Sequence, residues 1–199
     1  MAVRLVSLGE QTEYYTFSAR SLAQALGEMT RLGPRDPEGH HAASCEMRAD
    51  ILNGLHPSIV SNSTGEAPGW IATGQIGVGT LSFGFVLRFP QWSNIDSLSG
   101  PIRSEWDRFI RSLWIHERGH TDVTMSILGR FKEQFEALRV AAGGASAQAA
   151  MDEAESELRR QVKAVYDRLA FENQKASDLY DHEKRHGRTQ GARLNIRIR

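Results

Sequence analysis

The sequence has very little cysteine, because Cys45 is the only one among 199 residues. A disulfide within the chain is therefore excluded, and so is a metal site built from several thiolates. Charge of one sign is not in excess either, since 24 Lys and Arg residues balance 24 Asp and Glu residues. We therefore expect no nucleic acid as a partner. Any metal ion must be held by histidine and carboxylate side chains.

Long apolar runs are also missing. No stretch of 18 apolar residues occurs, so we expect no membrane span and no membrane partner. Residues 1–10 lack the apolar core and the small-residue cleavage site of a signal peptide. We expect a cytoplasmic protein, or a secreted or periplasmic protein if this chain is a processed form. The oligomeric state stays open.

The pattern of apolar and polar residues changes near residue 95. We expect an α+β fold in a single domain over residues 1–199. Residues 1–95 are mixed in character and predict a small antiparallel sheet with one helix. Residues 96–199 are typical of a long antiparallel helical pair. Its helices are predicted at 101–141 and from about 147 to beyond 179, with apolar residues at helical spacing in both.

Four local patterns refine this expectation. Ser21 is a suitable N-cap for a helix that ends at Gly33-Pro34. Residues 80–89 place five apolar side chains on one face and mostly small or polar ones on the other, and predict a strand, which Pro90 ends. Residues 53–69 are rich in Ser, Asn, Gly and Pro and predict a long loop. Residues 193–199 alternate like a short terminal strand.

The first predicted long helix contains the motif His116-Glu117-Arg118-Gly119-His120. Two histidines four residues apart lie on one face of a helix, one turn apart, where both imidazoles can bind one Zn²⁺. The glutamate next to the first histidine then lies beside the metal-bound water. This spacing is typical of zinc peptidases.

The predicted helix places this motif on its apolar side. At about 100° per residue, His120 and Glu117 fall within about 100° of His116. Burying an unpartnered imidazole or carboxylate costs several kcal/mol, and a metal ion or a dense hydrogen-bond network removes that cost. The burial therefore favours a metal site. The apolar residues on the same side are Trp106, Phe109, Leu113, Ile127, Phe131, Phe135 and Leu138.

A catalytic zinc ion usually has three protein ligands. If the helical pair turns near residue 144, the level opposite the motif lies near residue 170, which favours Glu172. His186 lies too far along for a straight hairpin, and would need a bend, an offset helix or a chain that folds back. The spacing leaves both candidates open.

A second motif, Tyr180-Asp181-x-x-x-x-His186-Gly187, extends through Arg188-Thr189-Gln190-Gly191-Ala192. Together with the first motif it resembles a bacterial family of unknown function, whose members are predicted to be secreted zinc-dependent proteases. The likeness covers nearly the whole chain, and includes Tyr14-Tyr15-Thr16-Phe17 and Phe89-Pro90-Gln91-Trp92. The family has Thr where this chain has Lys184.

The resemblance implies a zincin-like peptidase. His116 and His120 are then zinc ligands, Glu117 is the general base, and His186 is the third ligand, with Tyr180 and Asp181 near the site. Asp181 is either a carboxylate that orients a ligand imidazole or a helix-end charge. Tyr180 either stabilises the developing oxyanion or is a core residue with a solvated hydroxyl.

We therefore expect a zinc-dependent metallopeptidase with one catalytic Zn²⁺ and a peptide or protein substrate. Glu117 would take a proton from the zinc-activated water. The main alternative is a non-catalytic helical-hairpin module that binds a metal or a partner through His116 and His120. A third possibility is a zinc hydrolase that acts on amides other than peptides.

Overall fold

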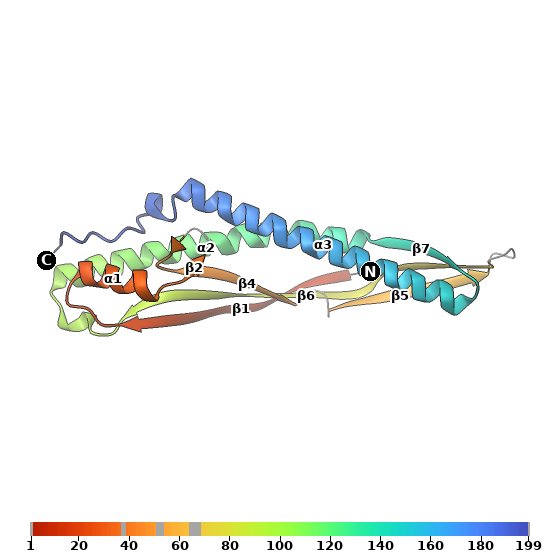
Figure 1. Cartoon of the computed structure of the whole chain (residues 1–199), viewed down its shortest axis with the longest axis horizontal. Coiled ribbons are helices and arrows are strands. Elements are labelled where there is room, and N and C mark those ends of the chain that lie inside the picture. The colour runs from red at the N-terminus through yellow and green to blue at the C-terminus, as the bar shows by residue number, and fades with distance from the viewer. Residues whose placement is uncertain (1, 37–38, 51–53, 64–68, 199) are drawn as a thin grey trace. The chain divides into compact units, whose positions relative to one another are not determined.

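The computed structural model describes residues 2–36, 39–50, 54–63 and 69–198. In these residues the fold is mixed α/β, with a five-stranded sheet, a two-stranded sheet and three α-helices (Figure 1). No helix of the described residues combines the length and the apolar character needed to cross a membrane. The chain forms two compact units. The first comprises Met1–Leu8, Ala49–Phe83 and Met125–Gln174, and the second Gly9–Arg48, Gly84–Thr124 and Lys175–Arg199.

The three predicted helices are confirmed. Helix α1 spans Leu22–Leu32, and its N-cap Ser21 accepts a hydrogen bond from the backbone of Gln24. Helices α2 (Gly100–Ala137) and α3 (Ala147–Lys184) have 38 residues each. Helix α2 ends before the predicted residue 141, because the following residues form strand β7 (Arg139–Gly144) instead.

The sheet of the first unit is built around strand β6 (Trp70–Trp92). Strands β5 (Leu55–Ser63) and β7 both pair with β6 in antiparallel register. The prediction of a loop over 53–69 is therefore wrong for β5, while 53 and 64–68 lie outside the described residues. Pro57, which has no N–H to donate, coincides with a shift of register between His56 and Pro57.

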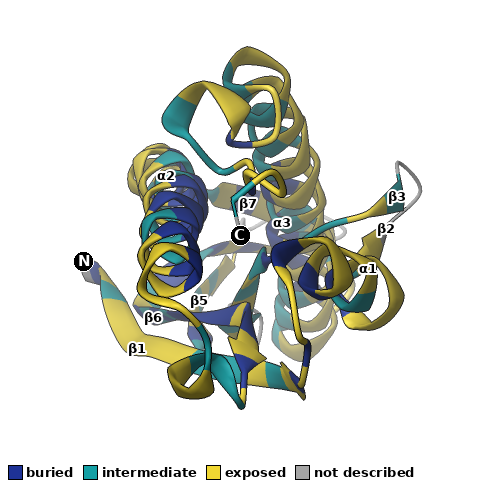
Figure 2. Ribbon diagram, turned by 90° about the vertical axis from the view of Figure 1, so that its left-hand side faces the viewer, coloured by how far each residue is buried: buried dark blue, intermediate teal, exposed yellow. Residues whose placement is uncertain are grey.

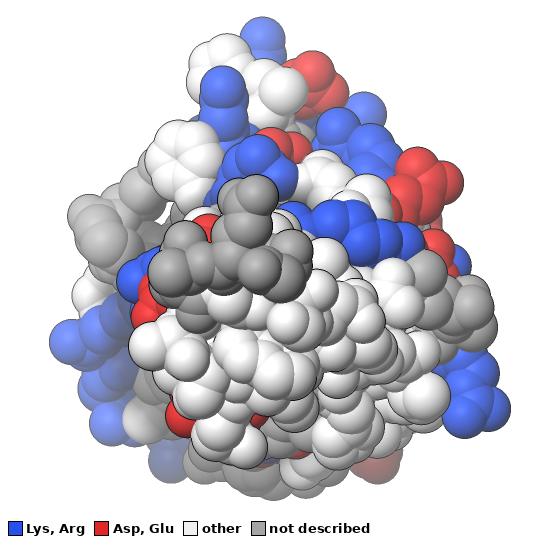
Figure 3. Space-filling model, turned by 90° about the vertical axis from the view of Figure 1, so that its right-hand side faces the viewer, with Lys and Arg blue, Asp and Glu red and all other residues white. Residues whose placement is uncertain are grey.

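Strand β5 and residues 70–87 of β6 contain no Asp, Glu, Lys or Arg. The corresponding end of the first unit is largely uncharged, as Figure 3 shows. Val60 and Val78 are exposed there, at 57% and 59%.

In the second unit, β6 pairs with strands β1 (Ala2–Phe17) and β4 (Ser44–Asp50). The hydrogen-bonded side-chain pairs Glu13–Arg88 and Thr16–Gln91 each join residues 75 apart in sequence. A constant offset is the register of parallel strands, so the expectation of a purely antiparallel sheet is wrong for β1 and β6. The predicted strand over 80–89 is confirmed as part of β6, which continues through Pro90.

The core of the second unit lies between this sheet, α1 and the first part of α2. Figure 2 shows the buried positions of α2 gathered on one side of the helix. Burial of these apolar side chains stabilises the placement of α2, at roughly 25 cal/mol per Å² removed from water. The largest members are Phe17, Leu22, Met29, Leu87, Phe89, Trp92, Trp106, Phe109 and Leu113.

The chain after α3 is held against α2 by an ion pair between partly exposed Arg108 and buried Glu105. Arg108 donates hydrogen bonds of 2.6 Å to the carbonyl oxygens of Gly191 and Arg193. Glu105, only 6% exposed, accepts from Arg108 and from the backbone N–H of Asn195. The hydrogen bond with Arg108 holds the pKa of Glu105 below its usual value. The described part of 193–199 forms turns and irregular backbone, so the predicted strand there is wrong.

Candidate metal centre

The motif of α2 lies on the buried side of the helix, as its periodicity predicted. His116, Glu117 and His120 are 5%, 4% and 9% exposed. They follow Trp106, Phe109 and Leu113 along the same face, and all of these residues belong to the second unit. A chance motif on the solvent face of the helix is thereby excluded.

Asp181, in the last turn of α3, completes a cluster with the two histidines. Its Oδ1 lies 2.9 Å from Nε2 of His116 and 3.3 Å from Nε2 of His120. One ligand atom from each of these three residues lies within 4.8 Å of the other two. Within the described ranges, this is the group of histidine, cysteine and carboxylate side chains that could hold a metal ion.

The other ring nitrogen of each histidine, Nδ1, also forms a hydrogen bond. Nδ1 of His116 lies 3.0 Å from Oε1 of Gln190, and Nδ1 of His120 lies 2.7 Å from Oγ of Ser177. An amide oxygen can only accept, so Nδ1 of His116 donates. Nε2, which faces Asp181, donates a hydrogen bond when the ring is protonated and offers a lone pair to a metal ion when the ring is neutral. This orientation is typical of metal-binding histidines.

The donor set fits zinc. Zinc is commonly bound by imidazole nitrogens and carboxylate oxygens at about 2.0–2.2 Å, so the ligand atoms of a tetrahedral site are roughly 3.3 Å apart. The separations of 2.9 and 3.3 Å between Asp181 and the two Nε2 atoms are close to this value. Three protein ligands would leave one coordination position for a water molecule or a substrate.

The charges of the cluster are strongly coupled. Burial opposes ionisation of Asp181, but hydrogen bonds from His116 and His120 hold the pKa of the carboxyl well below its usual value. Burial lowers the pKa of His116, yet the hydrogen bond with Asp181 and the charge of Glu117 leave it raised overall. Burial raises the pKa of Glu117 to about 6, although the two histidines act in the opposite direction.

Tyr180 covers the histidines. Its ring stacks on His116 at a centroid distance of 5.3 Å and meets the edge of His120 at 4.9 Å. Its hydroxyl accepts a 3.0 Å hydrogen bond from Nε2 of Gln190, which leaves the hydroxyl hydrogen for another acceptor. The side chain therefore lies beside the predicted metal ligands.

The approach of Tyr180 to α2 requires a glycine at position 119. A Cβ atom on Gly119 would lie 1.8 Å from the hydroxyl oxygen of Tyr180 and 2.2 Å from the adjacent ring carbon. Such distances are impossible without movement of the ring. The glycine of the motif thus makes room for the tyrosine.

We expect Gly119→Ala to lower the free energy of unfolding by about 1–3 kcal/mol, because the added methyl overpacks the site. The matched control is Gly129→Ala in the same helix, where a Cβ meets nothing within 4 Å. There, alanine should raise stability by up to about 1 kcal/mol through its better helix propensity. Urea unfolding of both variants measures the difference. Equal stabilisation by both would contradict the described packing of Tyr180.

The two sequence-based candidates for the third ligand lie outside the three-residue cluster. His186 is close, with Nδ1 3.7 Å from Oδ1 of Asp181 and a side chain that is 47% exposed. Glu172 belongs to the first unit, where its carboxylate lies 3.8 Å from Arg130. Asp181, which the sequence suggested as an orienting carboxylate or helix-end charge, belongs to the cluster that could hold a metal ion.

Sequence reasoning missed Gln190, Ser177 and Gly119. Gln190 and Gly119 lie inside the two motifs, and their presence there was the available signal. Ser177 lies one turn before Asp181 on α3, so its spacing of four residues could have indicated a shared helix face.

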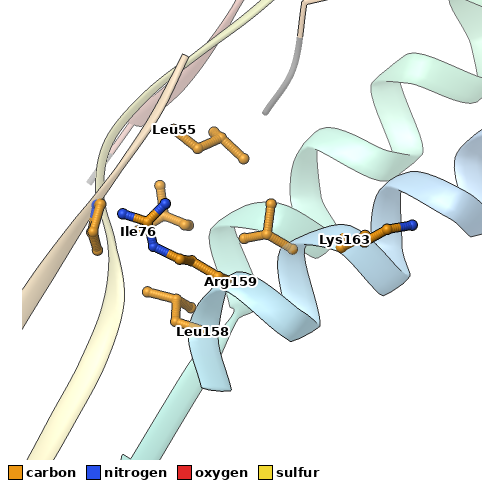
Figure 4. A pocket seen from close by; sticks show the side chains of 7 residues that line it. Leu55, Ile76, Leu158, Arg159 and Lys163 are labelled. Atoms are coloured by element: carbon orange, nitrogen blue, oxygen red, sulfur yellow. The ribbon is translucent and has the colours of Figure 1, made fainter. Parts of the chain in front are cut away.

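The first unit contains a separate cavity of about 190 Å³ between β5, β6 and α3. Figure 4 shows that its lining is mostly aliphatic, with Leu55, Ile76 and Leu158 near Arg159 and Lys163. No histidine, cysteine or carboxylate lines this cavity. Its described lining therefore offers no ligand of the kinds that zinc prefers.

Fold and cluster together define a mixed α/β protein in which Asp181 joins two buried histidines. A family model described as a bacterial protein of unknown function (DUF922) matches residues 12–187. The chain therefore belongs to this family, and the expected resemblance to a bacterial family of unknown function is confirmed. The description names no activity, so the protease function stays a prediction. No curated protein and no solved structure matches the chain.

Proposed function

We propose that this protein is a zinc-dependent peptidase whose metal is held by His116, His120 and Asp181. The observation that carries the proposal is the convergence of two buried Nε2 atoms on one carboxylate oxygen, with buried Glu117 adjacent in the motif. Bound zinc supplies a water of lowered pKa and polarises the scissile carbonyl. Gln190 and Ser177 orient the rings of His116 and His120 through hydrogen bonds with their Nδ1 atoms.

Glu117 is the proposed general base. Its carboxylate is 4% exposed and interacts electrostatically with His116, His120 and Asp181. It accepts a proton from the attacking water and then donates it to the leaving amine. A raised pKa suits a group that must both take up and release a proton near neutrality.

Tyr180 is the proposed electrophilic partner. Because Gln190 donates to its oxygen, the hydroxyl hydrogen is available for the oxygen that becomes negative during the reaction. Burial raises the pKa of Tyr180, which keeps the hydroxyl protonated. Its place against both histidine rings puts it next to the reacting centre.

The rival hypothesis is a non-catalytic metal-binding module. In a purely structural site, protein ligands fill all four coordination positions. The metal then binds no water, so a base such as Glu117 is not needed. The buried Glu117 therefore favours catalysis. A zinc hydrolase for non-peptide amides would use the same residues and differ only in its substrate.

Digestion of unfolded casein, followed by mass spectrometry, tests the proposal. We expect cleavage by the zinc-loaded protein, loss of at least about 100-fold in rate after removal of metal with a chelator, and recovery when zinc is added back. Zinc binding without cleavage of casein or of a random peptide pool would favour the structural module. Hydrolysis of small amides alone would favour the third possibility.

A further inference from the structure

A cavity of about 390 Å³ lies in the second unit. Its size falls within the range of ordinary ligand pockets. Buried apolar side chains line part of it, with Met29, Phe109 and Leu194 exposed by 2%, 3% and 7%. The lining can accept the methylene groups of an extended side chain.

The polar part of the cavity is basic. Arg188 and Arg193 line it together with His40 and His41, and none of its lining residues is acidic. Both arginine side chains are exposed, and among the residues that the structure describes neither guanidinium forms an ion pair with a carboxylate. A cavity with two arginines and no acid favours an anionic occupant, and a guanidinium can bind a carboxylate through two parallel hydrogen bonds.

The cavity adjoins the metal centre through two elements. Residues 188–194 supply Gln190, which holds His116, and also Arg188 and Arg193. On the other side, His41 lines the cavity, and its ring lies 5.7 Å from that of His186. His186 in turn is 3.7 Å from Asp181. The cavity therefore lies beside the metal centre.

We propose that the cavity is a substrate subsite that binds a carboxylate of the peptide through Arg188 and Arg193. This inference rests on the proposed function, because it takes the metal centre as the place of cleavage. The carboxylate is either an Asp or Glu side chain or the C-terminus of the peptide. The enzyme accordingly prefers acidic peptides or removes residues from free C-terminal ends.

Binding to a zinc-loaded Glu117→Gln protein tests the subsite separately from catalysis. Randomised hexapeptides, one pool with a free C-terminal carboxylate and one amidated, are equilibrated across a dialysis membrane, and retained peptides are sequenced by mass spectrometry. A side-chain ligand enriches Asp or Glu over Asn or Gln by about tenfold at one position in both pools. A terminal ligand enriches the free-acid pool over the amidated pool by a similar factor.

The double variant Arg188→Ala/Arg193→Ala in the Glu117→Gln background should abolish this enrichment. Alanine keeps the backbone carbonyl of residue 193, which accepts from Arg108. The matched control is Arg197→Ala, an exposed arginine of the same segment that does not line the cavity, and it should keep the enrichment. Equal retention of acidic and neutral peptides, or no retention of either, overturns the subsite. Failure of the wild-type protein to cleave would count against the peptidase proposal alone.

Discussion

The Glu117→Gln variant is expected to bind zinc like the wild-type protein and to lose peptide cleavage by about 10²- to 10⁴-fold. Glutamine has the shape of glutamate but cannot take a proton from water, and general base catalysis contributes a factor of this size. The measurement is the initial rate of casein cleavage together with zinc content from elemental analysis.

Folding of this variant is not expected to fail. Burial raises the pKa of Glu117 to about 6, so above that pH the carboxyl of the metal-free protein is ionised, and its burial lowers the free energy of unfolding. Neutral glutamine removes this penalty, and unfolding in urea at pH 8 should show undiminished stability. Cleavage at the wild-type rate by a Glu117→Gln protein of full zinc content would remove Glu117 from the mechanism.

The second large effect is expected at Asp181. Asp181→Ala should weaken zinc binding by more than about 100-fold, which exceeds the loss typical of residues that only orient a ligand. His186→Ala should weaken it by about tenfold or less, because His186 approaches the carboxylate and lies outside the cluster. Competition with a chromophoric zinc chelator measures both affinities.

His182→Ala provides the matched control for these variants. His182 is next to Asp181 in the same helical turn but is exposed, so its loss should leave zinc affinity unchanged. The opposite ranking, with a large loss for His186→Ala and a small one for Asp181→Ala, would restore the ligand set implied by the family resemblance.

The sequence predicted the first half of the site because helical periodicity is a local property. Residues 116 and 120 share a face with the apolar positions of α2 whatever the rest of the chain does, and their burial follows. The three helices were predictable for the same reason, together with the Ser21 cap.

The positions of His186 and Gln190 depend on how α3 ends, and no periodicity encodes that. The chain leaves the helix after Lys184, and both Arg185 and His186 adopt a left-handed backbone with φ of 51°. Gly187 continues with φ of 75°, and a Cβ there would lie 3.1 Å from the ring of His116. This turn brings the Gln190 segment onto the histidines. A straight helical hairpin could not predict it.

Strand β5 was missed for a different reason. Its residues are mostly polar, and Pro57 interrupts them, so composition favoured a loop. The strand forms because β6 is long enough to supply hydrogen-bonding partners along Trp70–Gly79. Pairing between distant segments, rather than the local sequence of β5, determines its conformation.

The most direct test of the central claim is an anomalous difference map of the zinc-loaded crystal, recorded at the zinc absorption edge. The account predicts one strong peak between Nε2 of His116, Nε2 of His120 and the carboxylate of Asp181. A peak bound to other residues, or no peak at these three side chains in a protein loaded with zinc, would contradict it.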